Sequence, residues 1–202
     1  YHITHIQNLP QITGTGGLVC DSRLATLASV PTTVAYEDIK DKRTRKQVPC
    51  GPQGVVADYV PFYLAPRSPM LYTISRGNIP GRDQQDIVHL VSSAEDMRDR
   101  GLGFVFTDGH PIMAITSFFD NLDDLDKVDW EVMDSRYWYD IDADPDRKRR
   151  RQAEFLVRDS CPWELIRFIA VINEESRKRA LKCLDTLRDR PNIQLRRDWY
   201  YG

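Results

Sequence analysis

The apolar residues of this 202-residue chain fall in short runs, and this pattern limits the folds that the chain can adopt. Runs such as FVFT at 104–107 and IVHLVS at 87–92 have the length of strands, whereas helices need longer periodic segments. The runs are mixed with short helical segments but do not alternate with them regularly. The pattern therefore favours an α+β fold over a doubly wound parallel sheet.

The same periodicities predict the order of the elements. We expect strands at 1–6, 58–63, 87–92, 104–107, 154–157, 168–172 and 193–195. We expect helices at 8–13, 36–46, 117–133 and 174–187, and one that starts at Ser93 behind a Ser92…Glu95 capping box. Turns or loops are expected at 14–17, 49–54, 66–69 and 139–147, and the basic run 147–151 is placed in the loop before a strand.

Length and charge suggest one domain, residues 1–202, with a local charged surface. A chain of 23.4 kDa is long enough to bury a core of its own. The net charge of −2 hides an asymmetry, because KDKRTRK at 40–46 and RKRRR at 147–151 are basic, whereas residues 120–134 hold seven acids against Lys127. Such separated patches indicate a polyanionic partner that is met at one part of the surface.

The four cysteines are too far apart in sequence for a CxxC metal knuckle, and a chain of this size needs no disulfides. We therefore expect free thiols in a reducing compartment. No apolar run approaches the length of a membrane span, and no signal-peptide pattern is present. We expect a cytoplasmic monomer with no membrane contact, and a short native tail before Tyr1.

Three motifs are better explained by structure than by chemistry. GTGG at 14–17 follows a helix and lacks the strand–GxGxxG–helix context of a dinucleotide fold, so it predicts a tight turn. The acids Asp123, Asp124 and Asp126 predict a solvated helix face, and we expect no metal site. His89 alternates with apolar residues and is interpreted as a hydrogen-bonded core histidine.

Two further segments leave structural and functional interpretations open. His2 and Thr4 lie two apart on a strand, so both side chains share one face and need polar partners if buried. Residues 58–72, DYVPFYLAPRSPMLY, gather rings, prolines and one Arg, which suits stacking of a flat ligand but equally suits a packed edge strand.

The stretch RKRRRQAEFLV at 147–157 places one carboxylate, Glu154, at the start of an otherwise apolar strand. A buried acid of this kind either pairs with a neighbouring Arg or stabilises positive charge on a substrate. The residues alone favour the first interpretation.

Taken in order, eight motifs resemble the DarT family, the DNA ADP-ribosyltransferase toxins of DarT–DarG toxin–antitoxin systems. They are YHITHIxNLP, RTRKxVP, DYVPFYxxPRSPMLY, HLVSS, FVFTDGH, YW, RRQAEFLV and DWYY, and together they span nearly the whole chain. Two segments depart from the family pattern: NLPQITGTGG is short and threonine-rich, and residues 21–40 look slightly lengthened.

The resemblance implies an ADP-ribosyltransferase fold, in which split antiparallel sheets hold NAD in a cleft. It implies transfer of ADP-ribose from NAD, the co-substrate, to thymine in single-stranded DNA in a sequence-dependent way, which blocks replication. It also implies a macrodomain antitoxin, DarG, that removes the mark. By position in the motifs, Glu154 and Arg43 correspond to the catalytic residues. The positions that contact the nucleotide are His2, Ile3, Thr4, Gln11, Val19, Arg43 and Tyr63.

DNA contacts in the family fall on three segments of this sequence. The corresponding residues are Arg67, Ser68, Pro69, Met70, Leu71, Tyr72, Arg136, Tyr137, Trp138, Tyr139, Lys148, Arg149, Arg150, Arg151 and Gln152. With the resemblance, Arg147 to Arg151 are interpreted as phosphate ligands that bring DNA to Glu154.

Three functions remain open at this point. The first is a DNA-modifying ADP-ribosyltransferase, which the resemblance favours. The second is a transferase that acts on another base, on RNA or on protein, and the third is a non-catalytic nucleic-acid-binding module. The residues do not separate thymine from guanine as the acceptor.

Overall fold

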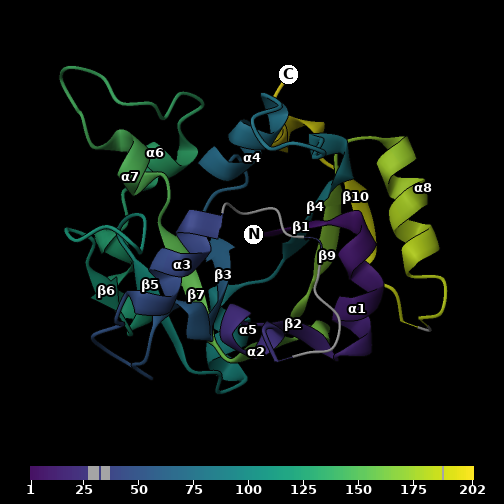
Figure 1. Ribbon diagram of the computed structural model, residues 1–202, viewed down its shortest axis with the longest axis horizontal. Helices are drawn as coiled ribbons and strands as arrows, with labels where there is room; N and C mark the ends of the chain where they lie inside the picture. The colour runs from purple at the N-terminus through teal and green to yellow at the C-terminus, as the bar shows by residue number, and fades with distance from the viewer. Residues whose placement is uncertain (27–31, 33–36, 188) are drawn as a thin grey trace.

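Two four-stranded sheets lie side by side, and the first residues of the chain run between them (Figure 1). The computed structural model describes residues 1–26, 32, 37–187 and 189–202. Most of the lengthened segment noted in the sequence, residues 27–31 and 33–36, lies outside the described residues.

The first sheet has the order β1-β4-β9-β10 and the second the order β3-β7-β5-β6. The strands of the first sheet are β1 (His2–His5), β4 (Ile87–Val91), β9 (Phe168–Val171) and β10 (Asn192–Leu195). Those of the second are β3 (Tyr59–Tyr63), β7 (Glu154–Arg158), β5 (Phe104–Thr107) and β6 (Phe118–Phe119). Every neighbouring pair is antiparallel except β9 and β10. The expected α+β fold with split sheets is confirmed, with one parallel pair added.

Sequence pattern decides which strands are central. IVHLV of β4 and EFLV of β7 are apolar without alternation, and both strands are flanked by a partner on each side. Pro61 lies in β3, which is an edge strand, because proline has no N–H to donate to a second partner strand. A separate two-stranded ribbon joins β2 (Gly17–Val19) to β8 (Ser160–Pro162).

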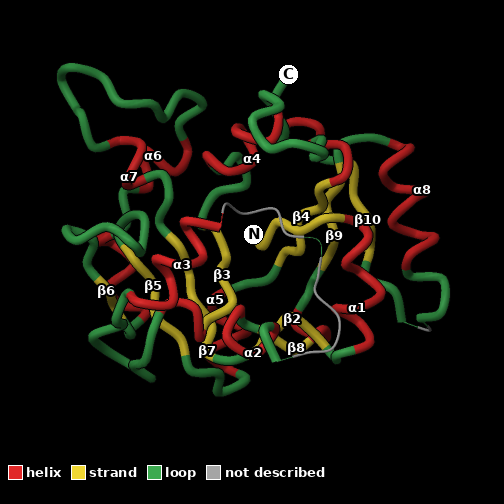
Figure 2. The backbone as a smooth tube through the Cα atoms, viewed as in Figure 1, coloured by secondary structure: helices red, strands yellow, loops and turns green. Residues whose placement is uncertain are grey.

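Helices are short and surround the sheets (Figure 2). They are α1 (Leu9–Gly14), α2 (Asp21–Leu24), α3 (Glu37–Arg45), α4 (Pro69–Ser75), α5 (Ala94–Asp99), α6 (Trp130–Asp134), α7 (Arg147–Arg150) and α8 (Glu174–Cys183). In Figure 1, α8 lies beside the first sheet, and α6 and α7 lie at the opposite side of the molecule.

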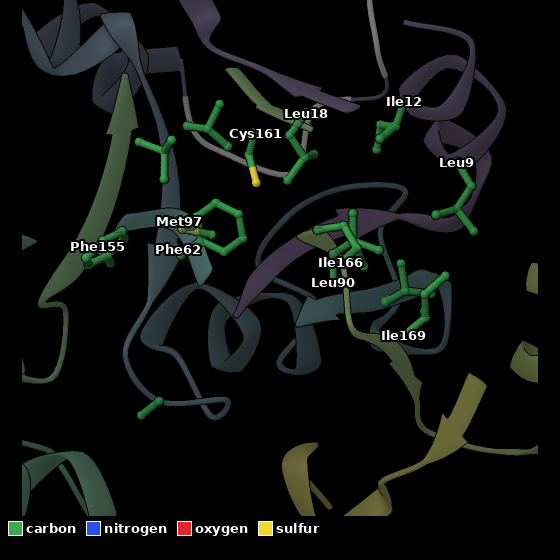
Figure 3. Close-up of a cluster of buried hydrophobic side chains, with 14 of the residues drawn as sticks. Leu9, Ile12, Leu18, Phe62, Leu90, Met97, Phe155, Cys161, Ile166 and Ile169 are labelled. Atoms are coloured by element: carbon green, nitrogen blue, oxygen red, sulfur yellow. The ribbon is translucent and has the colours of Figure 1, made fainter. Parts of the chain in front are cut away.

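The main core fills the space between the sheets. Phe62 and Phe155 reach it from the second sheet, and Leu90 and Ile169 reach it from the first (Figure 3). Cys161 is buried in the same cluster, and all four cysteines are free thiols, as expected.

His89 is a core histidine, as its alternating context predicts. Its side chain is fully buried, with Nε2 3.0 Å from the Pro66 carbonyl and Nδ1 3.2 Å from the Tyr200 hydroxyl. Because a carbonyl can only accept, Nε2 carries the proton and donates to Pro66. Burial lowers the pKa of His89 to about 3, so the ring is neutral at physiological pH.

The prediction of one long acidic helix at 117–133 is wrong. Phe118 and Phe119 instead pair with β5, a 3-10 helix covers Leu122–Lys127, and α6 starts anew at Trp130. Asn121 and Asp129 each accept a hydrogen bond from a backbone N–H two or three residues later, so both act as caps that divide the segment. The acids Asp123 and Asp126 are exposed, as expected of a solvated face.

Several boundaries also differ from the sequence prediction. Ser93, not Ser92, caps α5, and its Oγ accepts from the Asp96 N–H at 3.1 Å. The turn expected at 66–69 leads directly into α4, because Ser68 caps a helix whose first residue is Pro69. The expected loop at 147–151 contains the helical turn α7, and α8 ends at Cys183, before the expected end at 187.

The glycine turn at 14–17 brings β2 against β8. Gly17 has a φ of 149°, and a Cβ there would lie 2.2 Å from the Cys161 carbonyl oxygen. Gly14, three residues earlier, ends α1, and a Cβ there would have nothing within 4 Å. Of these two glycines, only Gly17 is therefore required by close approach of the two backbones.

We predict that Gly17→Ala destabilises the protein by about 2–3 kcal/mol, because the new methyl group clashes with β8 and the backbone must shift. The melting temperature should fall by roughly 5–10 °C. Gly14→Ala is the matched control and should leave the melting temperature unchanged or slightly higher. Equal melting temperatures for the two variants would contradict the assignment.

Candidate active site

One cavity gathers the residues that the sequence analysis assigned to a nucleotide. It lies between the sheets and is bounded by β1, α1, β2, α3, β3 and β7. All seven predicted nucleotide-binding residues line it, together with the predicted catalytic carboxylate: His2, Ile3, Thr4, Gln11, Val19, Arg43, Tyr63 and Glu154. Residues far apart in the sequence are thus brought to one place by the fold.

Arg43 and Glu154 form a buried ion pair in this cavity. The Arg43 Nη1 donates to Glu154 Oε2 at 2.9 Å, and the two residues are 6 % and 3 % exposed. Burial disfavours the charge of Arg43, but Glu154 outweighs burial and raises the pKa of the guanidinium. Arg43 Nη2 is buried without a hydrogen-bond partner among the described residues, so one donor of the pair is available to a ligand.

Two neighbouring strands fix the position of Glu154. Its N–H donates to Thr107 Oγ1 of β5 at 3.0 Å, and the Thr107 hydroxyl donates to the Gly109 carbonyl at 2.7 Å. On the other side, Glu154 is the register partner of Tyr63 in β3. Burial raises the pKa of Tyr63, so its phenol is neutral beside the carboxylate. These contacts fix the backbone of Glu154, and Arg43 holds its carboxylate at the wall of the cavity.

His2 contributes a neutral imidazole to the opposite wall. Its Nδ1 donates to the Pro61 carbonyl at 2.8 Å, which leaves Nε2 as an acceptor. Burial lowers the pKa of His2 to about 4. Thr4, on the same strand, accepts from Asn8 Nδ2 at 3.0 Å. Both polar side chains that the strand pattern singled out are thus partnered and line the cavity.

His110 lines the cavity too, and sequence reasoning did not name it as a site residue. Burial lowers its pKa, although the Glu154 carboxylate acts in the opposite direction. Its Nδ1 is buried without a partner among the described residues. The signal available in the sequence was a histidine that directly follows the turn pair Asp108–Gly109 at the end of a buried strand.

Arg149 holds the loop that carries His110. Its guanidinium bonds Asp146 at 2.7 and 2.8 Å, and Asp108 at 3.1 Å, and its carbonyl accepts from the His110 N–H at 2.9 Å. A Cβ on Gly109 would lie 2.1 Å from the Arg149 Nη1, so glycine is required at this contact. Arg149 therefore connects the loop that carries His110 to Asp146, and its contact with DNA stays a prediction.

The other arginines of the basic run are also engaged within the protein. Arg150 pairs with Asp129 and Asp144, and Arg151 is 3 % exposed and donates to backbone carbonyls, among them that of Val132 at 2.7 Å. Arg147 donates to the Tyr137 carbonyl at 3.0 Å. Lys148 alone in the run is exposed and has no ion pair with a described residue. In the free protein, the arginines of the run therefore have partners within the chain, and their contact with DNA phosphates stays a prediction.

The remaining predicted DNA contacts form a buried group and an exposed group, and three further residues are half-buried. Ser68, Pro69, Leu71 and Trp138 are buried, and the Trp138 Nε1 donates to the Tyr201 hydroxyl at 2.9 Å. Leu71 of α4 packs in a buried apolar cluster, and the Trp138 ring meets the ring of Tyr72, on the same helix, edge to face. The exposed residues are Tyr72, Arg136, Tyr137, Tyr139 and Lys148. Met70 and Gln152 line the cavity, and Arg67 lies over the Tyr201 ring at 4.4 Å.

Membrane spans and metal sites can both be assessed in the described residues. No helix there is both long enough and apolar enough to cross a membrane. No group of three or more His, Cys, Asp or Glu side chains there has the arrangement of a metal site.

Comparison with known proteins gives one consistent result. Residues 1–201 match the family model described as ssDNA thymidine ADP-ribosyltransferase, DarT. A curated DNA ADP-ribosyl transferase of Thermus sp. (strain 2.9) is 43 % identical over 206 residues, which cover 100 % of this chain and 95 % of that protein.

Solved structures agree with the sequence match. Thermus sp. 2.9 DarT in complex with ADP-ribosylated ssDNA superposes with a TM-score of 0.93 at 41 % identity, covering 99 % of this chain and 94 % of that one. The same protein in complex with NAD+ gives a TM-score of 0.87 at 41 % identity, with 99 % and 96 % covered. Full-length similarity in both sequence and fold leaves no other assignment: the chain belongs to the DarT family of ssDNA thymidine ADP-ribosyltransferases.

Proposed function

We propose that Glu154 and Arg43 transfer ADP-ribose from NAD, bound in the cavity between the sheets, to a thymine base of single-stranded DNA. The observation that carries this proposal is the buried Arg43–Glu154 pair at 2.9 Å, in the cavity lined by all the predicted nucleotide contacts. Support for the ligands comes from the relatives, because Thermus sp. 2.9 DarT has been solved with NAD+ and with ADP-ribosylated ssDNA.

The chemistry requires a negative group beside the nicotinamide ribose. When the bond from ribose C1′ to nicotinamide breaks, the electron pair leaves with nicotinamide and positive charge develops on the sugar. A rigid, buried carboxylate stabilises that charge without reorganisation. Glu154 is such a group, because Thr107 and Tyr63 flank it and water is largely excluded. The neutral phenol of Tyr63 adds an aromatic surface next to the leaving group.

The acceptor base has to lose a ring proton before its nitrogen bonds to C1′. Thymine N3–H is weakly acidic, so its removal needs a base or stabilisation of the resulting anion. Arg43 has one buried donor without a partner among the described residues, Nη2, that suits stabilisation of such an anion. Glu154 and the unprotonated nitrogen of neutral His110 are two proton acceptors in the cavity wall.

DNA meets the protein through rings more than through phosphates. Tyr72, Tyr137 and Tyr139 are 42 %, 62 % and 59 % exposed, so their faces are available to unstacked bases. Lys148 and Arg136 are the exposed cations among the predicted DNA contacts. Stacking of this kind, and modification of a pairing-edge nitrogen, both require an unpaired strand.

The biological role follows from the chemistry. ADP-ribose on the pairing edge of thymine blocks copying of the template, so the chain acts as a toxin whose mark the macrodomain antitoxin, DarG, removes. NAD and replicating DNA are both present in the cytoplasm, which is where the protein acts, as a monomer.

The first test concerns the reaction. Incubated with NAD, the protein should add one ADP-ribose to a single-stranded oligonucleotide containing all four bases, and mass-spectrometric sequencing should locate the label on thymine. The same strand annealed to its complement should be modified hardly at all. Glu154→Gln, which keeps the shape of the side chain, should lower the rate by roughly 10²–10³. Label on guanine, on RNA or on protein instead would overturn the proposed acceptor.

A second prediction concerns the stability of the buried pair. Glu154→Ala leaves the Arg43 charge buried and unpaired, so the free energy of unfolding should fall by roughly 3–5 kcal/mol. The double variant Arg43→Met/Glu154→Leu removes both charges and should recover most of that loss while remaining inactive. Denaturant unfolding measures both values. A double variant less stable than Glu154→Ala would show that the pair is not the cause.

A third prediction separates Arg149 from its neighbour Lys148. Arg149→Ala releases the loop that carries His110, and misplacement of a site group by about 1 Å can lower turnover roughly 100-fold. The KM for DNA should change little. Lys148→Ala, the matched control, should raise the KM for DNA a few-fold and leave turnover intact. If the two variants gave the same kinetic pattern, Arg149 would be a DNA ligand and its framing role would be excluded.

A further inference from the structure

Two of the described residues that line the cavity are cations, Lys40 and Arg43 of α3, and they differ in how tightly a carboxylate holds them. The charged side chains in the cavity wall are Asp21, Lys40, Arg43 and Glu154. His2 and His110 also line it, but burial lowers the pKa of both rings, so they add no charge at neutral pH. The residues outside the described part of this region, 27–31 and 33–36, contain no Lys or Arg.

Arg43 is already committed to Glu154. The pair is 2.9 Å apart, and both partners are almost fully buried. Moving Arg43 to an incoming phosphate would leave Glu154 buried without its counter-charge, which is costly. The nitrogen of Arg43 that has no partner among the described residues, Nη2, is the one proposed above to stabilise the acceptor anion, so another cation is better placed to serve the phosphates.

Lys40 is held far more loosely. Its Nζ lies 3.6 Å from Asp21 Oδ1, beyond hydrogen-bond distance, and the two side chains are 37 % and 36 % exposed. A pair of this kind contributes little energy and exchanges readily for a better ligand. Of the two cations in the cavity wall, Lys40 is thus the one that can bind an anion without breaking a buried ion pair.

Position on the helix supports the same assignment. Lys40 and Arg43 are three residues apart on α3, so their side chains share one face, with Cβ atoms about 5–6 Å apart. In a dinucleotide the diphosphate is separated from the scissile bond by one ribose. With the bond beside Glu154, a cation one helix turn along α3 from Arg43 is therefore a candidate to contact the diphosphate.

We propose that Lys40 binds the diphosphate of the dinucleotide, a role distinct from that of Arg43 in the sugar and acceptor site. This inference rests on the proposed function, since it takes NAD as the ligand of the cavity. Asp21 holds Lys40 at the cavity wall in the free protein, and the diphosphate replaces it on binding. Lys40 contributes binding energy that is the same before and during the reaction, so it affects KM and not turnover.

The experiment uses ADP-ribose as the probe, because it carries the diphosphate but lacks the scissile bond. Calorimetry should show that Lys40→Ala weakens ADP-ribose binding about tenfold, the size of one charge-assisted hydrogen bond. The KM for NAD should rise by a similar factor, with kcat within about threefold of wild type. The loss should shrink as salt is raised, because a partly exposed charge pair is screened.

Two variants control for a structural role of the side chain. Lys40→Arg keeps the charge and should bind ADP-ribose within about threefold of wild type. Lys42→Ala removes an exposed lysine of the same helix that does not line the cavity, and it should bind like wild type. Melting curves check that each variant is folded.

Unchanged ADP-ribose affinity in Lys40→Ala overturns the proposal, as does an equal loss in Lys42→Ala or a loss confined to kcat. Failure of the proposed function looks different. A wild-type protein that binds ADP-ribose through Lys40 and releases nicotinamide, yet labels no DNA, would retain the Lys40 assignment and lose the acceptor. A wild-type protein with no affinity for ADP-ribose would overturn both.

Discussion

The site depends on one buried ion pair. Arg43 comes from α3 and Glu154 from β7, 111 residues later in the chain, and each would be an uncompensated charge without the other. The pair therefore fixes the distance between a short helix and the second sheet. The amino group and carbonyl of Tyr1 bond the backbone of Tyr63 at 2.9 and 2.8 Å, and this contact joins the first sheet to the second beside the pair. The cavity lies beside these two contacts, the Arg43–Glu154 pair and the Tyr1–Tyr63 backbone bonds.

Central strands were predictable because burial on both faces leaves a continuous apolar run, as in β4 and β7. The segment 117–133 was not, because its acids and leucines fit a helical period while Asn121 and Asp129 cap the backbone locally and divide it. Local side-chain to backbone bonds of this kind compete with helix formation, and periodicity does not register them. The family resemblance placed Glu154 and Arg43, whereas the residues alone indicated only a paired acid, which Glu154 also is.

The basic run shows what sequence reasoning about charge leaves out. Five consecutive cations predict a phosphate-binding surface. Asp146 is a local partner of Arg149, whereas other partners are distant in the sequence: Asp108 for Arg149 and Asp129 for Arg150. Folding brings these acids together and converts the run into an internal network that frames the catalytic loop. His110 was missed for the converse reason, since only the fold shows that the end of β5 opens into the cavity.

The arginines of the basic run have partners within the protein, and this leaves fewer free cations to contact DNA phosphates. Counterion release scales with the number of phosphates that free cations contact, and Lys148 and Arg136 are the exposed cations of the proposed surface. Affinity must then come mainly from bases stacked on Tyr72, Tyr137 and Tyr139, which have faces that any unpaired base can use. A net charge of −2 suits this arrangement, because general attraction to duplex DNA is weak and contact is made where single strands expose their bases. Of the arginines that the sequence pattern assigns to DNA, Arg149 also bonds Asp108 and the backbone of His110, and so supports the loop beside Glu154.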